Sequence, residues 1–123
     1  VCESWMTPAL FLSVAFIAGS VISFFTGSSW GTFAICIPIA VPMAYSFTGG
    51  QLGTLVYAAV GAVVSGGLFG DHCSPVSDTT VLSSLGAACD HIDHVRTQLP
   101  YALLAAAVSI ILWIVVALVG GAV

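Results

Sequence analysis

Long stretches without charge constrain this chain more than any other feature. No Asp, Glu, Lys or Arg occurs from Ser4 to Gly70, and none occurs from Thr97 to Val123. Only 5% of the residues are charged, whereas a soluble domain carries about 25%. Apolar runs of about 20 residues are long enough to cross the roughly 30 Å hydrocarbon core of a bilayer. The sequence therefore predicts an all-α integral membrane protein, with residues 1–123 in one membrane domain.

The charge balance identifies the surroundings that the chain prefers. The net charge is −4, and Arg96 is the single cation. Binding to nucleic acid or to anionic lipid headgroups needs clusters of basic residues, so both are excluded and the bilayer itself is the expected partner. Because Lys and Arg favour the cytoplasmic side, Arg96 weakly places residues 90–98 in the cytoplasm.

The first part of the chain, residues 5–47, predicts a helical hairpin. Its arms are apolar, and its tip is the polar, Gly-punctuated stretch 26–31. Thr7-Pro8 suits a helix start, with Thr as the cap and Pro at the first helical position. Pro38 and Pro42 predict a short or kinked second arm. The pattern resembles a re-entrant hairpin, and two ordinary spans joined by a tight loop are the alternative.

The remainder predicts a broken helix and a final span. Residues 52–89 form an apolar helix that is interrupted at 70–78, where Gly, Pro and polar residues gather. The part after the interruption is too short to cross a membrane alone. We expect a polar loop at 90–98 and a last transmembrane helix over 101–121, which Pro100 starts.

The interruption at 70–78 is the best candidate for a functional site. Ionisable groups at membrane depth are costly, so they indicate function by default. An ionised carboxylate can bind Na⁺ and a protonated one cannot, so competition between the ions is sufficient for exchange. Asp78 is favoured because hydroxyls surround it in the sequence, and Asp71 comes second. The predicted ion or substrate ligands here are Asp78, Asp71, Ser77, Thr79 and Ser74, with Na⁺ at Asp78, Ser77 and Thr79, and the proton-linked groups are Asp78, Asp71 and His72. We also expect unpaired carbonyls at the end of the first half-helix to contribute oxygen ligands.

The hairpin tip supplies further hydroxyls that could face this site. Thr26, Ser28 and Ser29 are the candidates, across a shared cavity. Two plainer interpretations stay open. The tip could be a hydroxyl-rich loop with Trp30 at the lipid–water boundary. The interruption at 70–78 could be a surface loop in which Asp78 only caps a helix.

A metal site is a weaker interpretation of the histidines. His91 and His94 are three residues apart, and His72 with Cys73 would complete a mixed set that Zn²⁺ accepts. However, no Cys-x-x-Cys pair is present, and a predicted helix separates the two clusters. An aqueous loop with local charge pairing is the preferred interpretation of 90–98. No resident cofactor is expected, because Na⁺ and H⁺ would be transported ions.

Three motifs resemble one family of transporters. The stretches GDHCSPVSDTT at 70–80, CDHIDHVRTQLPY at 89–101 and TGSSWGT at 26–32 are similar to signatures in the C-terminal half of NhaC-type Na⁺/H⁺ antiporters. The resemblance implies a multi-pass secondary transporter of the bacterial inner membrane, in a superfamily with inverted repeats, re-entrant hairpins and broken helices. The chain would then be half of such a repeat pair. Its partner would be the N-terminal half of the same transporter, and a homodimer is left open.

Taken together, residues and resemblance predict Na⁺/H⁺ antiport by alternating access and no enzymatic activity. The family also contains members that exchange organic acids, so Na⁺- and H⁺-coupled exchange of malate, lactate or an amino acid is the main alternative. A small membrane scaffold subunit, assembled through Gly- and Ala-rich helix faces, is a more distant one. A metal-dependent membrane enzyme is the weakest.

Overall fold

Residues 6–120 are described by a computed structural model and form five helices, with no strand among them. In chain order they are α1 (Pro8–Thr26), α2 (Ser29–Phe47), α3 (Thr54–Cys73), α4 (Asp78–Gly86) and α5 (His91–Gly120). Every helix except α4 is long and apolar enough to cross a membrane. The prediction of an all-α membrane protein is confirmed.

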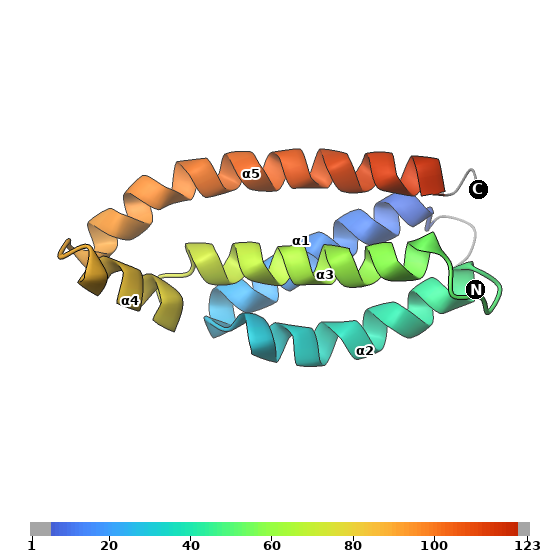
Figure 1. Ribbon diagram of the computed structural model, residues 1–123, viewed down its shortest axis with the longest axis horizontal. Helices are drawn as coiled ribbons and strands as arrows, with labels where there is room; N and C mark the ends of the chain where they lie inside the picture. The colour runs from blue at the N-terminus through green and yellow to red at the C-terminus, as the bar shows by residue number, and fades with distance from the viewer. Residues whose placement is uncertain (1–5, 121–123) are drawn as a thin grey trace.

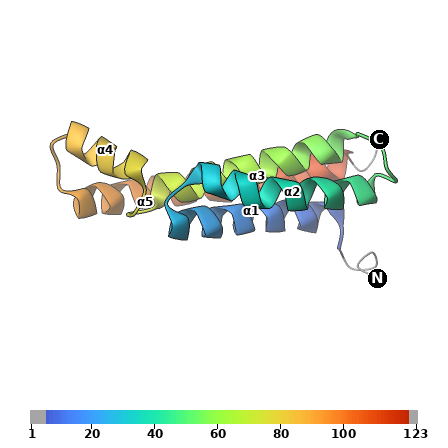
Figure 2. The same cartoon turned by 90° about the horizontal axis from the view of Figure 1, so that it is seen from below.

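The helices lie roughly along one axis, with α3 in the middle. Figure 1 shows α5 on one side of α3, α2 on the other, and α1 crossing behind it. In both views α4 lies beyond the end of α3, beside the first turns of α5 (Figures 1 and 2). The α1–α2 turn, the α3–α4 interruption and the start of α5 therefore all lie towards the same end of the molecule.

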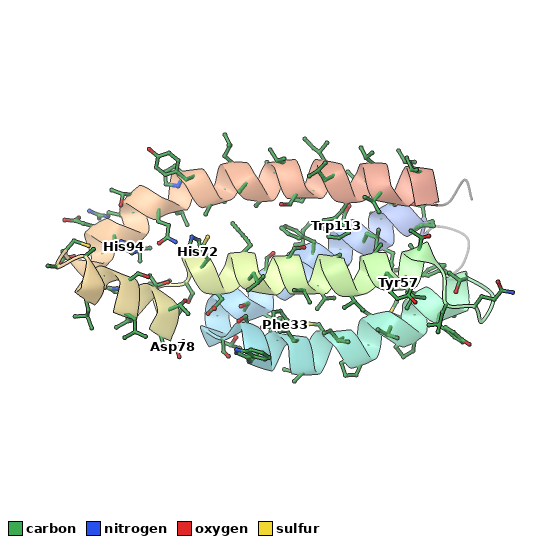
Figure 3. The ribbon with its side chains drawn as sticks, in the orientation of Figure 1. Phe33, Tyr57, His72, Asp78, His94 and Trp113 are labelled. Atoms are coloured by element: carbon green, nitrogen blue, oxygen red, sulfur yellow. The ribbon has the colours of Figure 1, made fainter. Side chains whose placement is uncertain are left out.

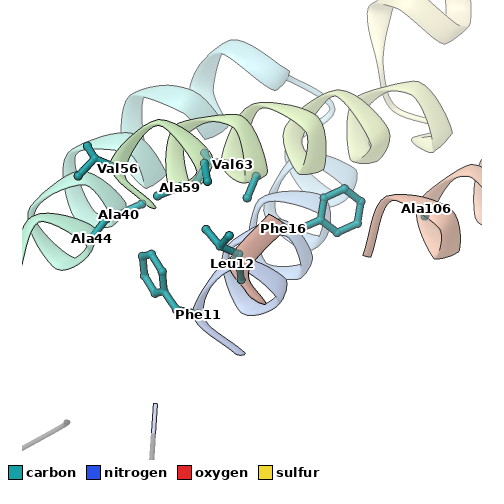
Figure 4. Packing of buried hydrophobic residues seen from close by; sticks show 12 residues of the cluster. Phe11, Leu12, Phe16, Ala40, Ala44, Val56, Ala59, Val63 and Ala106 are labelled. Carbon is teal, nitrogen blue, oxygen red and sulfur yellow. The ribbon is translucent and has the colours of Figure 1, made fainter. Parts of the chain in front are cut away.

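The core is formed where α1, α2 and α3 meet. Leu12 from α1 and Val63 from α3 are completely or almost completely buried, and Ala44 of α2 is fully buried (Figure 4). Other apolar side chains of α1, such as Val14 and Ile17, are exposed instead. Apolar side chains on the outside are expected where lipid, and not water, is the solvent.

Small residues bring α1 and α3 into backbone contact. A Cβ on Gly66 would lie 2.2 Å from the carbonyl oxygen of Phe16, and one on Gly70 would lie 2.2 Å from that of Ser20. Gly66 and Gly70 are four residues apart, so they share one face of α3. This small-xxx-small pattern allows membrane helices to approach closely, and here it sets the position of α1 against α3.

The hairpin arms are full helices. Thr7 caps α1 by accepting a hydrogen bond from the Leu10 amide at 3.3 Å, and Pro8 is the first helical residue, as predicted. Pro38 and Pro42 lie inside α2, which continues through them to Phe47 and is curved in Figure 1.

The interruption between α3 and α4 is shorter than expected. Gly70 to Cys73 still belong to α3, Asp78 already belongs to α4, and the non-helical residues are 74–77. The half-helix after it ends at Gly86, earlier than expected.

The last helix corrects a second expectation. The polar loop predicted for 90–98 is helical, and α5 begins at His91 instead of at Tyr101. The Asp90 carboxylate accepts hydrogen bonds from the Ile92 and Asp93 amides at 2.9 and 3.3 Å, which caps this end. Pro100 is inside the helix and bends it without ending it, since proline removes a single backbone donor. Residue 121 lies outside the described residues.

Candidate functional site at the contact of two helix interruptions

Pro75 explains why α3 stops where it does. The residue before a proline is disfavoured in the α conformation. Ser74 accordingly has φ −72° and ψ 128°, an extended conformation. Ser77 is extended as well, with φ −68° and ψ 134°, and α4 starts directly after it. The backbone between the two helices is thus fixed by one short Ser-Pro-containing sequence.

The hairpin tip packs directly against this interruption. Gly27 ends α1 with φ +66°, a conformation that favours glycine. A Cβ at Gly27 would lie 3.0 Å from the carbonyl carbon and oxygen of Val76. In addition, the Ser74 hydroxyl donates to the carbonyl oxygen of Phe24 at 2.7 Å. The two interruptions therefore touch, without a cavity between them at this point.

Asp71 is the buried carboxylate at this contact. Only 8% of its surface is exposed, and the Ser77 hydroxyl donates to its Oδ1 at 2.7 Å. The Ser29 hydroxyl, from the first turn of α2, donates to its Oδ2 at 3.3 Å. Ser77 Oγ lies 2.7 Å from Thr79 Oγ1. Because the single Ser77 hydrogen goes to Asp71, Thr79 is the donor in that pair. Hydroxyls from both interruptions thus converge on one carboxylate, which we call the Asp71 cluster (Asp71, Ser29, Ser77, Thr79).

The electrostatics of the cluster favour a cation. Among residues 6–120, the side chains that donate hydrogen bonds to the Asp71 carboxylate are the neutral hydroxyls of Ser29 and Ser77, which do not compensate its charge. Arg96 is exposed on α5. A buried carboxylate without a countercharge is costly, and carboxylate and hydroxyl oxygens are ligands that hard cations accept. The cluster can therefore hold a small cation or a proton.

The other predicted site residues do not join the cluster. Asp78, which the sequence favoured as the main ion ligand, is exposed in the first turn of α4 (Figure 3). Thr26 is exposed, and its hydroxyl bonds to the Ile22 carbonyl within α1 at 2.9 Å. The Ser28 hydroxyl caps α2 by accepting from the Gly31 amide. His72 has an exposed side chain.

The carbonyl groups at the end of α3 are largely occupied. The Gln98 side-chain amide donates to the His72 carbonyl at 3.1 Å, and Thr80 Oγ1 donates to it at 3.3 Å. The Asp71 carbonyl accepts from the Ser74 amide at 3.3 Å. The Asp71 and His72 carbonyls thus already accept hydrogen bonds, and a role for the carbonyls at the end of α3 as ion ligands stays a prediction. The role of Gln98 was missed because residues 90–98 were predicted to be a loop.

A cavity of about 560 Å³ adjoins the cluster between α1, α3 and α5. Asp71 and Thr79 line it on one side, and Gln98 lines it from α5. Much of the rest of its wall is apolar. Its volume is in the range that accommodates a small solute, so the cluster has an approach route. The residues that line it are Phe16, Ser65, Leu68, Phe69, Asp71, His72, Thr79, Gln98, Tyr101, Ala102, Ala105, Ala106 and Ser109.

The histidines near the start of α5 make contacts of other kinds. His91 Nε2 lies 2.7 Å from the Pro75 carbonyl oxygen, and His94 Nδ1 lies 3.9 Å from Cys89 Sγ. Within residues 6–120, no group of three or more His, Cys, Asp or Glu side chains could hold a metal ion. The proposed zinc set of His91, His94, His72 and Cys73 is thus not assembled.

A helical membrane protein with a broken helix and a buried carboxylate at the break is the class that this fold and site define. Within that class, the chain belongs to the Na⁺/H⁺ antiporter family, which matches it over residues 2–118. The predicted resemblance is confirmed.

The similar proteins have both known and unknown substrates. The chain is 37% identical over 114 residues to the malate-2H⁺/Na⁺-lactate antiporter of Bacillus subtilis, covering 93% of this chain and 23% of that protein. It is 32% identical over 113 residues to the Na⁺/H⁺ antiporter NhaC of Alkalihalophilus pseudofirmus, covering 92% and 23%. An uncharacterised protein of Haemophilus influenzae is 52% identical over 110 residues, covering 89% and 20%.

The chain thus spans about a fifth of the length of the curated relatives it matches. No solved structure matches it.

Proposed function

We propose that this chain is part of a secondary transporter that exchanges Na⁺ for H⁺ across the bacterial inner membrane by alternating access. The observation that carries the proposal is the buried Asp71 carboxylate at the contact of the two interruptions, held by the Ser29 and Ser77 hydroxyls. The carboxylate binds Na⁺ when it is ionised and loses that ability when it takes up a proton. Competition for one group couples the two ions, and no covalent step is needed.

Asp71 takes the leading role in this mechanism, and Asp78 the second. Asp71 is buried and adjoins the cavity, which gives an ion a route to it. Asp78 is exposed at the start of α4 in this chain. Since the relatives are several times longer, the rest of the transporter is the expected partner on exposed faces such as this one. The bilayer is the expected partner of the exposed apolar faces.

Exchange of a small organic solute is a second candidate, favoured by the volume of the cavity. About 560 Å³ exceeds what a bare ion requires, and one relative is a malate-2H⁺/Na⁺-lactate antiporter. The charges of the residues that line the cavity favour Na⁺ over an organic anion. Asp71 lines it and no Lys or Arg is among its lining residues, so His72 is the one lining side chain that could offer an organic dianion a positive charge.

The experiment measures Na⁺-induced proton movement in everted membrane vesicles that contain the full-length transporter. We expect Asp71→Asn to abolish Na⁺-induced proton movement, because the amide carries no negative charge for Na⁺ and takes up no proton in its place. Asp78→Asn should retain exchange. Asp93→Asn, an exposed carboxylate in the first turn of α5, is the control and should match the wild type.

The outcomes separate the alternatives. Wild-type vesicles that respond to malate or lactate but not to Na⁺ alone would favour organic-acid exchange. Full activity in Asp71→Asn, at equal amounts of protein in the membrane, would refute the assignment of Asp71. Loss of exchange in Asp78→Asn alone would transfer the leading role to Asp78.

A further inference from the structure

The non-helical residues 74–77 are held from three directions. Ser74 bonds to the Phe24 carbonyl of the hairpin, and Ser77 bonds to Asp71 of α3. The third contact comes from α5, where His91 Nε2 lies 2.7 Å from the carbonyl oxygen of Pro75. This last contact joins segments that are 16 residues apart and belongs to no residue so far assigned to the ion site.

The imidazole of His91 has a polar neighbour at each nitrogen. A carbonyl oxygen only accepts hydrogen bonds, so Nε2 carries a hydrogen and donates it to Pro75. Nδ1 lies 3.2 Å from the hydroxyl of Ser84, a residue of α4 that is 2% exposed. The ring is half-buried between the interruption and α4. It therefore connects the start of α5 to the Ser-Pro sequence and to α4.

The path from His91 to the Asp71 cluster is short. Pro75 is two residues before Ser77, and the backbone between them forms a turn in which the Ser77 amide donates to the Ser74 carbonyl at 3.4 Å. A displacement of the Pro75 carbonyl would therefore move Ser77 Oγ, which is 2.7 Å from Asp71 Oδ1. On the other side, Gly27 lies so close to Val76 that a Cβ there would be 3.0 Å from the Val76 carbonyl, so the hairpin tip packs closely against this backbone.

We propose that His91 is a positioning residue for the ion site. By donating to the Pro75 carbonyl, it holds Ser77 where its hydroxyl meets the Asp71 carboxylate. This inference rests on the proposed function, because Na⁺ affinity is the quantity that it explains. His91 does not touch the ion, and its effect is transmitted through the backbone of residues 75–77.

The test compares three variants in the full-length transporter, each at measured amounts in the membrane. His91→Ala removes the donor, and we expect the KM for Na⁺ to rise about fivefold while the maximal rate stays within about twofold. His91→Gln keeps an N–H group near the position of Nε2 and should restore a KM within about twofold of the wild type. His94→Ala is the control, since this histidine lies one turn further along α5 and contacts Cys89 instead.

The possible failures are distinct. Unchanged KM in His91→Ala, or an equal rise in His94→Ala, would overturn the positioning role while leaving the antiport proposal intact. A failure of His91→Gln to restore the KM would show that the Pro75 hydrogen bond is not what matters. Absence of Na⁺-dependent exchange in the wild type would instead refute the proposed function.

Discussion

Replacing Gly66 with alanine tests the backbone contact between α1 and α3. The added Cβ would lie 2.2 Å from the Phe16 carbonyl oxygen and 3.0 Å from its carbonyl carbon. Ordinary contacts begin at 3.4 Å, so α1 and α3 would have to separate by about 1 Å locally. The obstacle is backbone, which cannot rotate away as a side chain can. Overpacking of this kind costs about 3 kcal/mol.

The measurement is thermal unfolding of the purified full-length transporter in detergent, followed by circular dichroism or by exposure of a thiol to a fluorescent probe. We expect Gly66→Ala to unfold at a clearly lower temperature than the wild type. Gly86→Ala is the matched control, because a Cβ there has nothing within 4 Å. It should be neutral or slightly stabilising, since alanine has the higher helix propensity.

A third variant separates steric contact with backbone from contact with a side chain. A Cβ on Gly67 would lie 2.6 Å from Cε1 of the Phe33 ring, which can turn away (Figure 3 shows Phe33 between α2 and α3). Gly67→Ala should therefore cost less than Gly66→Ala. Equal stability of Gly66→Ala and Gly86→Ala would refute the conclusion that backbone contact holds α1 against α3.

Further predictions concern α5 and the turn before it. Trp113→Phe removes the 3.1 Å hydrogen bond from the indole Nε1 to Ser65 Oγ and should cost about 1 kcal/mol, measured by thermal unfolding against the wild type. An unchanged unfolding temperature would contradict a stabilising role for this bond. Ala88→Gly should raise the unfolding temperature, because Ala88 has φ 52°, a conformation that costs an L-residue about 1–2 kcal/mol and glycine very little. Ala87→Gly, whose φ is −83°, should lower it instead, and the opposite order would contradict the argument.

Local sequence signals predicted much of the fold. The apolar runs identified the membrane helices, Thr7 and Pro8 marked the start of α1, and the Gly- and Pro-containing stretches located both interruptions. The polar segment at 90–98 was misassigned because its composition suggests a loop. Two contacts between residues that are distant in sequence hold this segment in place as a helix. His91 lies against the Pro75 carbonyl, and the Gln98 side chain donates to the His72 carbonyl.

The choice between the two aspartates shows the limit of sequence neighbours. Asp78 is flanked by Ser77 and Thr79, but successive residues at the start of a helix point in directions about 100° apart. Side chains that are adjacent in sequence therefore need not point into the same site. Asp71 has a partner from α2, Ser29, which is 42 residues away. No local pattern could have indicated that contact.

The glycine contact between α1 and α3 also restricts how the molecule can move. With backbone against backbone at Gly66 and Gly70, no layer of side chains remains that could change rotamer and let one helix slide past the other. The two helices, and the hairpin tip attached to α1, should therefore behave as one rigid body. α5 contacts this body partly through small buried residues such as Ala106 and partly through the long side chains of Trp113 and Gln98, which can adopt other rotamers. Under the proposed function, we therefore expect α1, α3 and the hairpin tip to move together, and rotamer changes to be easiest where these side chains of α5 contact them.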